Sequence, residues 1–389
     1  MNGKRSDRQP LRITRIALEN WRNFSRVDIG LPGRVFLIGP NASGKSNFLD
    51  SIRFLHDLVA VGGGFQQAVR NREGVSRLRC LAARRYPDVG LKVSLGNDAS
   101  SATWEYEVAF TQDSRQRPVL KKEIVTAQGR ALLSRPDAKD RGDPERLTQT
   151  YLEQVNVNQD FREIADFFRA VRYLHIVPQL VRDPDRSVGR RDDPFGGDFL
   201  AQVARTPVKI RNARLGRIRD ALRVAVPQLS ELEPWFDVRG TPHLRGKYEH
   251  WRPQGAWQTE TDFSDGTLRL LGLLWVVLDG AGPLLLEEPE LSLHPEVVRL
   301  VPQVFARMQR RTGRQVFVTT HSTDLLLDDG IALDEVLILE PQDTGTRIKP
   351  VTAIMQLQAL LDGGSTLADA VFPYTRPERV HQLSLFGER

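Results

Sequence analysis

The sequence predicts an α/β protein with a parallel sheet at its core, and three observations favour this class. Residues 35–38 form an apolar run that leads into a glycine-rich loop and then into a helical pattern over 47–58. The apolar run 284–287 ends in two adjacent glutamates, and a third run, 315–319, is followed by Thr-His-Ser. Buried strands of parallel sheets are short apolar runs, and ligands bind where such strands end. We therefore expect these polar residues to meet at one edge of one sheet.

The remaining segments predict how the core is completed. The other expected elements are, in chain order, strands over 11–18, 27–31, 91–95, 103–110, 119–125, 173–177 and 336–340, and helices over 199–232, 268–278 and 295–309. The polar, proline-containing segment 129–146 is expected to be a surface loop, and the charged segment 182–197 to be mobile. The pattern indicates one α/β core whose two halves are separated by a long insertion.

Four regions are expected from this pattern. Residues 1–180 would hold the glycine-rich loop and an antiparallel β subdomain, and residues 181–262 an inserted helical lobe. Residues 263–350 would complete the parallel sheet, and residues 351–389 would form a C-terminal helix and a polar tail.

Composition narrows the class of protein. The 389 residues carry 40% hydrophobic and 27% charged residues, which is ordinary for a globular protein that buries a large core. No apolar run approaches the length that crosses a bilayer, and the polar segment Met1–Pro10 lacks the apolar core of a signal peptide. Cys80 is the sole cysteine, and the seven histidines show no metal-ligand spacing. We therefore expect a cytoplasmic protein with no membrane partner. The net charge of +6 permits nucleic-acid binding without establishing it.

The segment Gly39–Ser46, Gly-Pro-Asn-Ala-Ser-Gly-Lys-Ser, has the spacing of a phosphate-binding loop. It follows a strand and precedes a helix, which is the context that this motif requires. Its backbone N–H groups and the helix N-terminus would surround an anion. Lys45 would reach the β- and γ-phosphates of a nucleotide, and the Ser46 hydroxyl would ligate Mg²⁺. The alternative is a glycine-rich turn that matches by chance.

The two glutamates at the end of the apolar run 284–287 are expected to have different roles. Glu287 would hold Mg²⁺ through water, and Glu288 would orient or deprotonate the attacking water. The alternative is a solvated acidic turn, because acidic residues are common at helix starts.

Two further polar positions are candidates. Ser264, in Phe-Ser-Asp-Gly-Thr, lies at the start of the helix that precedes the acidic strand, where capping the helix is the simpler interpretation. His321 follows a strand and could sense or stabilise the γ-phosphate, although a hydrogen-bonded loop histidine would have the same sequence.

Taken in order, the phosphate loop, the Ser-x-Gly helix start, the Glu-Glu-Pro strand end and the Thr-His-Ser strand end resemble the ABC-type ATPase heads. The likeness is to the soluble branch that includes RecF, the SMC proteins and the OLD-family ATPases. The segment Leu18–Phe24, Leu-Glu-Asn-Trp-Arg-Asn-Phe, also resembles the first-strand motif of RecF-like proteins. The resemblance covers roughly 11–60 and 173–340 and implies a head with a parallel phosphate-loop core, an antiparallel β subdomain and an inserted helical lobe.

The resemblance implies ATP and Mg²⁺ as cofactors and gives each motif residue a role. The implied nucleotide contacts are Gly39, Asn41, Ala42, Ser43, Gly44, Lys45, Ser46, Asn47 and Arg22, with Ser264 and Gly266 of the opposite protomer. The implied metal-binding residues are Ser46, Glu287 and Gln179. Glu288 would be the catalytic carboxylate, His321 the switch histidine, and Glu290–His294 the loop at a dimer seam. ATP would thus join a head-to-tail homodimer.

Three positions depart from the family pattern. Glu287 replaces the usual aspartate, Asp265 stands within Ser-Asp-Gly where Ser-Gly-Gly is common, and His294 replaces an aspartate of transporter heads. The side chain of Glu287 is one methylene longer than that of an aspartate at the metal. The aspartate at 265 changes how the backbone of this turn approaches the γ-phosphate.

Four functions remain open from the sequence. The first is the ATPase subunit of an OLD-like anti-phage defence system that acts with a nuclease or effector, expected on a separate chain because about fifty residues follow Glu340. The second is a RecF-like repair ATPase that binds double-stranded DNA directly. The third is a transporter subunit, which the Leu18–Phe24 motif and the Ser-Asp-Gly sequence disfavour. The fourth is a non-hydrolytic, ATP-gated scaffold.

The segment Val208–Arg223 predicts a basic amphipathic helix, broken at Gly216, that could lie on DNA or be a solvated face.

Overall fold

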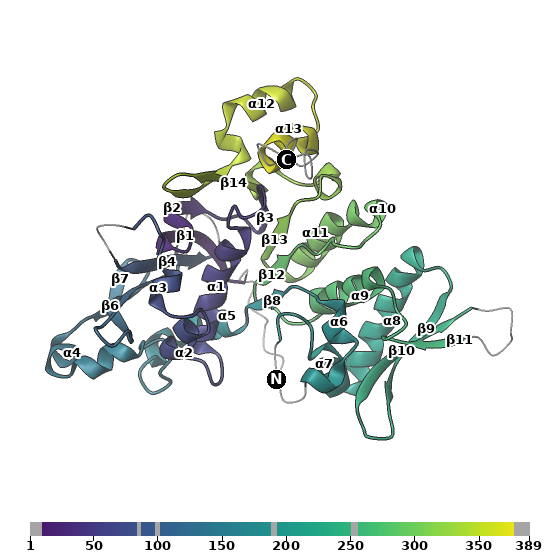
Figure 1. The fold of residues 1–389 in the computed structure, drawn as a ribbon, viewed down its shortest axis with the longest axis horizontal. Helices are drawn as coiled ribbons and strands as arrows, with labels where there is room; N and C mark the ends of the chain where they lie inside the picture. Colours follow the sequence, from purple (N-terminus) through teal and green to yellow (C-terminus); the bar gives the residue numbers. More distant parts are fainter. Residues whose placement is uncertain (1–9, 84–86, 98–101, 188–192, 250–255, 377–389) are drawn as a thin grey trace, which may run out of the picture.

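The computed structural model describes residues 10–83, 87–97, 102–187, 193–249 and 256–376. Residues 188–192, within the segment expected to be mobile, lie outside this set, as does most of the expected polar tail. The molecule extends in three directions from a central sheet: the β subdomain, the inserted lobe and a small C-terminal part (Figure 1). No helix in the described ranges has both the length and the apolarity needed to cross a membrane.

The central sheet has the strand order β15-β14-β3-β13-β12-β8. Its strands are β3 (Arg34–Ile38), β8 (Arg172–Leu174), β12 (Leu284–Glu287), β13 (Val316–Thr320), β14 (Val336–Gln342) and β15 (Gly345–Pro350). All neighbours are parallel except β14 and β15. Glu287 pairs with Thr319, and Ile38 with Thr320, so the carboxyl ends of β3, β12 and β13 lie at one edge. The predicted α/β class and parallel core are confirmed.

The helices that flank this sheet differ from expectation in their bounds and, in two places, in their number. They are α1 (Lys45–Val59), α9 (Asp265–Leu278), α10 (Pro295–Val298) and α11 (Val301–Thr312). The helix expected over 295–309 is two helices, because Pro302 cannot donate a backbone hydrogen bond and begins a new helix in its first turn. At the C-terminal end, α12 (Met355–Asp362) and α13 (Leu367–Thr375) replace the single expected helix.

The predicted antiparallel subdomain is a sheet of order β2-β1-β4-β5-β6-β7. Its strands are β1 (Arg12–Trp21), β2 (Phe24–Gly30), β4 (Val89–Gly96), β5 (Trp104–Gln112), β6 (Pro118–Ala127) and β7 (Arg130–Arg135). The short helices α2 (Phe65–Arg70), α3 (Val75–Leu78) and α5 (Arg162–Arg169) lie with it. Its core joins it to α1, where the buried ring of Phe54 stacks on Phe110 at 5.5 Å and meets Trp21 edge-on at 5.3 Å. The position of α1 is therefore fixed by both sheets.

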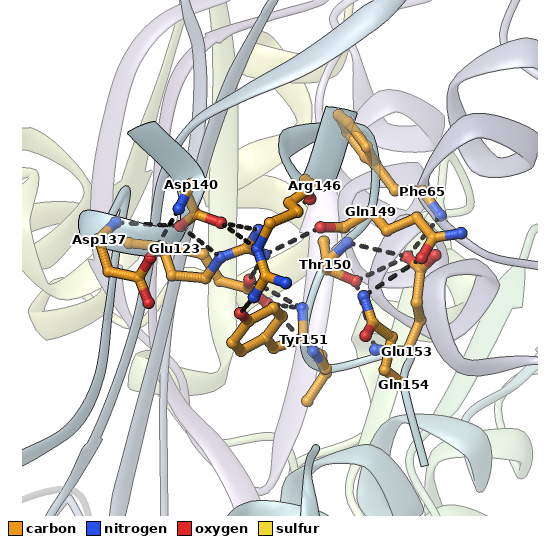
Figure 2. Close-up of polar contacts among 12 residues, drawn as sticks. Phe65, Glu123, Asp137, Asp140, Arg146, Gln149, Thr150, Tyr151, Glu153 and Gln154 are labelled. Carbon is orange, nitrogen blue, oxygen red and sulfur yellow. Dashed lines mark hydrogen bonds and ion pairs between the residues drawn. The ribbon is translucent and has the colours of Figure 1, made fainter. Parts of the chain in front are cut away.

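The segment expected to be a surface loop, 129–146, lies mostly at the surface, but the prediction of a loop is wrong. This segment forms the edge strand β7 and the helix α4 (Ala138–Gly142). The fully buried Arg135 pairs with Glu123 and Asp140, both at 2.9 Å, and its guanidinium lies 3.8 Å from the ring centre of Tyr151. Figure 2 shows Glu123, Asp140, Arg146 and Tyr151 gathered in one polar cluster. Because these charges satisfy one another, Arg135 and Asp140 are buried, whereas most other residues of the segment stay exposed.

The inserted lobe contains more strand than expected. It begins with α6 (Pro178–Val181), α7 (Phe199–Arg205) and α8 (Val208–Ala225) and continues into a sheet of order β11-β10-β9. These strands are β9 (Leu229–Phe236), β10 (Pro242–Tyr248) and β11 (Ala256–Thr259). The helical prediction for 229–232 is therefore wrong. The expected break at Gly216 is also wrong, because α8 runs through it without interruption.

Candidate nucleotide-binding site

The phosphate loop joins β3 to α1 and has backbone angles that restrict two of its positions to glycine. Gly39 has φ 156° and Gly44 has φ 100°. A Cβ at Gly39 would lie 2.7 Å from the Leu339 carbonyl oxygen, and one at Gly44 would overlap the Asn23 amide nitrogen. The loop therefore stays tightly wrapped against its neighbours. Asn41, Ala42 and Ser46 remain exposed on its outer side, and Ser43 is buried.

Lys45 lies at the centre of the site. Its ammonium group donates to the carbonyl oxygens of Gly39 at 3.0 Å and Pro40 at 3.2 Å. Burial lowers the pKa of Lys45 to about 8, although Glu288, Glu287 and Glu290 act in the opposite direction. Burial destabilises the charged form of the lysine. A bound phosphate would stabilise that form, because the anion replaces the interactions with water that burial removes.

Ser46 and Glu287 face each other across the site. The Ser46 hydroxyl donates to one oxygen of Glu287, and the Tyr173 hydroxyl donates to the other. Burial and the nearby carboxylate raise the pKa of Tyr173, so that its hydroxyl remains a donor. No cluster of three acidic, histidine or cysteine side chains suited to a metal occurs in the described ranges. One hydroxyl and one carboxylate nevertheless fit Mg²⁺, which takes few protein ligands and the remainder from phosphates and water.

Glu288 and His321 lie at the ends of adjacent strands. Glu288 has the left-handed φ of 43°, and its N–H donates to the Thr319 carbonyl at 3.0 Å. Oε1 of its carboxylate lies 3.2 Å from Nε2 of His321. Burial, and next the charge of Lys45, lower the pKa of His321. The imidazole is therefore neutral at pH 7 and can donate one hydrogen bond toward Glu288.

The loop after Glu288 is anchored at its base. The Thr320 hydroxyl donates to the buried carboxyl group of Glu290 at 2.5 Å, and burial raises the pKa of Glu290. Arg269 of α9 lines a small cavity beside Leu286–Pro289. Arg269 was not among the sequence predictions.

Ser264 and Gly266 lie at the start of α9. The Ser264 hydroxyl accepts from the Thr267 N–H at 3.1 Å, so it caps the helix. A Cβ at Gly266 would lie 2.5 Å from the carbonyl oxygen of Ser292, which places this turn against the Glu290–His294 loop. Among the described residues, no hydrogen bond or ion pair joins Ser264 or Gly266 to the phosphate loop of the same chain.

Two predicted residues lie outside the central contacts. Arg22 sits in the β1–β2 turn with φ 54°, and its guanidinium lies 3.4 Å from a carboxylate oxygen of Asp50 on α1. Gln179 is exposed in the first turn of α6. Its expected role at the metal stays a prediction, whereas Tyr173, from the same segment, contacts the Glu287 carboxylate.

Asn23 is a site residue that the sequence analysis missed. Its amide donates to the Ser43 carbonyl at 2.8 Å and to the Thr346 hydroxyl at 2.7 Å, and it accepts from the Asn47 amide at 2.8 Å. The side chain of Asn47 is thus directed at Asn23. The only signal in the sequence was the second asparagine of Asn-Trp-Arg-Asn.

The basic helix α8 is only partly open to a ligand. Arg214 pairs with Asp279 at 2.8 Å and stacks on Trp275, and Arg219 pairs with Asp220. Arg217 is exposed on the same helix. Ion pairing therefore reduces the net positive charge of this surface.

The family model described as "AAA domain, putative AbiEii toxin, Type IV TA system" matches residues 34–328. Endonuclease GajA of Bacillus cereus (strain VD045) is 33% identical over 67 residues, which are 17% of this chain and 12% of that protein. DNA replication and repair protein RecF of Roseiflexus castenholzii (strain DSM 13941 / HLO8) is 46% identical over 44 residues, which are 11% of each chain. The chain thus spans about an eighth of the length of these curated relatives.

Solved structures resemble the whole described fold. An SMC head domain with an extended coiled coil, bound to the C-terminal domain of ScpA and derived from Pyrococcus furiosus, has a TM-score of 0.50 at 12% identity. The alignment covers 91% of this chain and 100% of that one. An SMC head bound to the C-winged helix domain of ScpA has a TM-score of 0.51 at 13% identity, with 87% and 97% coverage. The chain belongs to the AAA-domain family named above, has the fold of the SMC heads, and resembles the ABC-type ATPases of the RecF, SMC and OLD branch.

Proposed function

We propose that the chain binds and hydrolyses ATP with Mg²⁺, and that two copies close around the nucleotide as a homodimer. The observation that carries this proposal is the convergence of Lys45, the Ser46–Glu287 contact and the Glu288–His321 contact at one sheet edge. Among the described residues, no hydrogen bond or ion pair joins the Ser264–Gly266 turn to the phosphate loop of the same chain, and this supports a site completed by a second copy.

In the proposed reaction, Lys45 and the loop N–H groups stabilise the charge that develops on the phosphoryl oxygens. Glu288 orients the attacking water, and the neutral His321 holds the Glu288 carboxylate by a hydrogen bond. Ser46 would bind Mg²⁺ directly and Glu287 through water, and the bound ion would compensate phosphate charge. Tyr173 keeps Glu287 turned toward Ser46.

For the biological role, we propose the ATPase subunit of an OLD-like anti-phage defence system that acts with a nuclease or other effector. The local similarity to endonuclease GajA supports this role. The alternative is a RecF-like repair ATPase that binds double-stranded DNA directly, which the 46% identity to RecF and the exposed Arg217 favour. A non-hydrolytic ATP-gated scaffold would keep the same contacts without turnover. The cytoplasmic location and the four regional boundaries stay predictions.

Steady-state ATP hydrolysis, measured with and without double-stranded DNA, tests this proposal. Replacing the Glu288 carboxylate by an amide removes the group that orients water but leaves Lys45 and Ser46 in place. We therefore expect Glu288→Gln to bind ATP, to hydrolyse it about a hundredfold more slowly or worse, and to accumulate as a dimer.

Each outcome separates the candidates. Wild-type turnover in the variant would refute the role of Glu288. No turnover in the wild type under any condition would favour the scaffold. Stimulation by DNA that is lost in Glu288→Gln would favour the RecF-like alternative, and indifference to DNA would favour a protein partner.

A further inference from the structure

Asp265 is the one charged residue in the Ser264–Gly266 turn. It is the first residue of α9, and 42% of its side-chain surface is exposed. A carboxylate suits the positive end of a helix dipole. The same charge would repel the γ-phosphate of a nucleotide that approached Ser264 from a second copy.

Arg182 cancels this charge within the chain. Its Nη2 lies 2.6 Å from Oδ1 of Asp265 and also donates to the Phe263 carbonyl oxygen at 2.7 Å. The two contacts lie on either side of Ser264 in the sequence. One guanidinium group therefore both neutralises the turn and fixes the backbone that precedes it.

The segment that carries Arg182 also contacts the acidic strand. Arg182 directly follows α6, and α6 follows β8, which pairs in parallel with β12. His175, between them, lies with Nδ1 3.2 Å from the Glu287 carbonyl oxygen. Figure 1 shows α6 beside α9. The Ser264–Gly266 turn is thus tied to the metal-side carboxylate through one short piece of chain.

We infer that Arg182 is a positioning residue that neutralises Asp265, so that the Ser264–Gly266 turn can accept the γ-phosphate of ATP bound to a second copy. This inference rests on the proposed ATP-dependent dimer. It explains how this chain tolerates an acid in the turn. Arg269 of α9 also interacts electrostatically with Asp265, but Arg182 is the cation in direct contact with its carboxylate.

A double-substitution experiment tests the pairing in the Glu288→Gln background. Dimer formation is followed by sedimentation velocity during a titration with ATP and Mg²⁺. Arg182→Ala should raise the ATP concentration for half-maximal dimer by about tenfold, because an unpaired carboxylate then faces phosphate. Asp265→Asn added to Arg182→Ala should restore the original midpoint, since no charge remains to be neutralised.

The rescue distinguishes charge compensation from simple support of the backbone. If Arg182→Ala impairs dimerisation equally when it is combined with Asp265→Asn, Arg182 acts only through the Phe263 carbonyl and the inference is wrong. An unchanged midpoint in Arg182→Ala would also overturn it. Arg205→Ala, which removes an exposed arginine of α7, is the matched control and should have no effect.

Failure of the proposed function would look different. If Glu288→Gln with Arg182 intact forms no dimer at saturating ATP, the dimer itself is refuted. Thermal unfolding of each variant checks folding. Arg182→Lys keeps the charge and should retain most of the dimerisation even if Arg182→Ala unfolds.

Discussion

The ammonium group of Lys45 is buried against the carbonyl oxygens of its own loop, and this environment controls its charge. Burial lowers its pKa to about 8, from the usual value near 10.5. The protonated form is the one that attracts phosphate. Between pH 7 and pH 9 the free protein therefore changes from mostly charged to mostly neutral at this position.

This titration predicts a pH-dependent affinity for ATP. Bound phosphate raises the pKa of Lys45, so binding takes up a proton wherever the free lysine has lost its own. Affinity should be nearly constant below pH 7 and should fall as the pH rises through 8, approaching roughly tenfold per pH unit above it. Calorimetric titration of Glu288→Gln with ATP and Mg²⁺ from pH 6.5 to 9.5 measures the change.

Lys45→Arg is the control for this prediction. An arginine keeps its proton throughout this range, so residual binding by the variant should be flat across it. An equal decline in both proteins would assign the effect to another group and would contradict the prediction for Lys45.

At the residue level, the sequence predicted the functional groups that are neighbours in the chain. The Lys45–Ser46 pair and the Glu287–Glu288 pair are each adjacent in sequence, and parallel strands bring their ends together. Asn23 and Tyr173 were not predictable in this way. Asn23 contacts the phosphate loop from the β1–β2 turn, so its hydrogen bonds depend on how the antiparallel sheet packs on the core. Tyr173 contacts Glu287 from the neighbouring strand of the central sheet, so its hydrogen bond depends on which strands pair.

At the level of elements, β7 shows where sequence periodicity fails. Its segment looked like a loop because arginine, aspartate and proline are rare in cores. Arg135 makes that composition compatible with burial: its hydrogen bond lowers the pKa of Asp140 to about 2, and it donates to the Gln149 and Arg146 carbonyls at 2.9 and 2.8 Å. The lobe sheet was missed similarly, because pairing with β10 rather than local pattern makes 229–236 a strand.

The Arg135 cluster makes a prediction about stability. Arg135→Ala would leave the buried carboxylate of Glu123 without its cation and that of Asp140 with Arg146 alone, at 3.3 Å. We expect a loss of about 3–5 kcal/mol in the free energy of unfolding, measured with urea at pH 7. Arg15→Ala is the matched control, because its pair with Asp28 is 61% and 46% exposed and should contribute about 1 kcal/mol or less. Equal losses from the two variants would mean that the buried cluster adds nothing specific.

At the level of the whole molecule, the Ser264–Gly266 turn makes no hydrogen bond or ion pair with the phosphate loop of its own chain among the described residues. Lys45 and Glu288 lie at the edge of the central sheet, whereas Ser264 lines a groove with the end of α8 and the loop at Ser292. We therefore propose that each chain supplies one half of a site and that a second copy supplies the other half. A two-fold dimer would form two sites, each with a phosphate loop from one copy and a Ser264 turn from the other.

A mixing experiment tests this arrangement. Lys45→Ala disables the phosphate loop, and Ser264→Arg blocks the turn, so each protein alone should be inactive. In an equal mixture, half of the dimers pair the two variants, and each such dimer has one intact site. Hydrolysis should therefore recover to roughly a quarter of the wild-type rate, if exchange is random and the two sites are independent. Mixing Lys45→Ala with Ser46→Ala, which are defective in the same half, should recover nothing. An inactive mixture of the first pair would mean either that each chain hydrolyses ATP alone or that both sites of a dimer must be intact. Sedimentation of the mixture would distinguish these two cases, because it shows whether the mixed dimer forms.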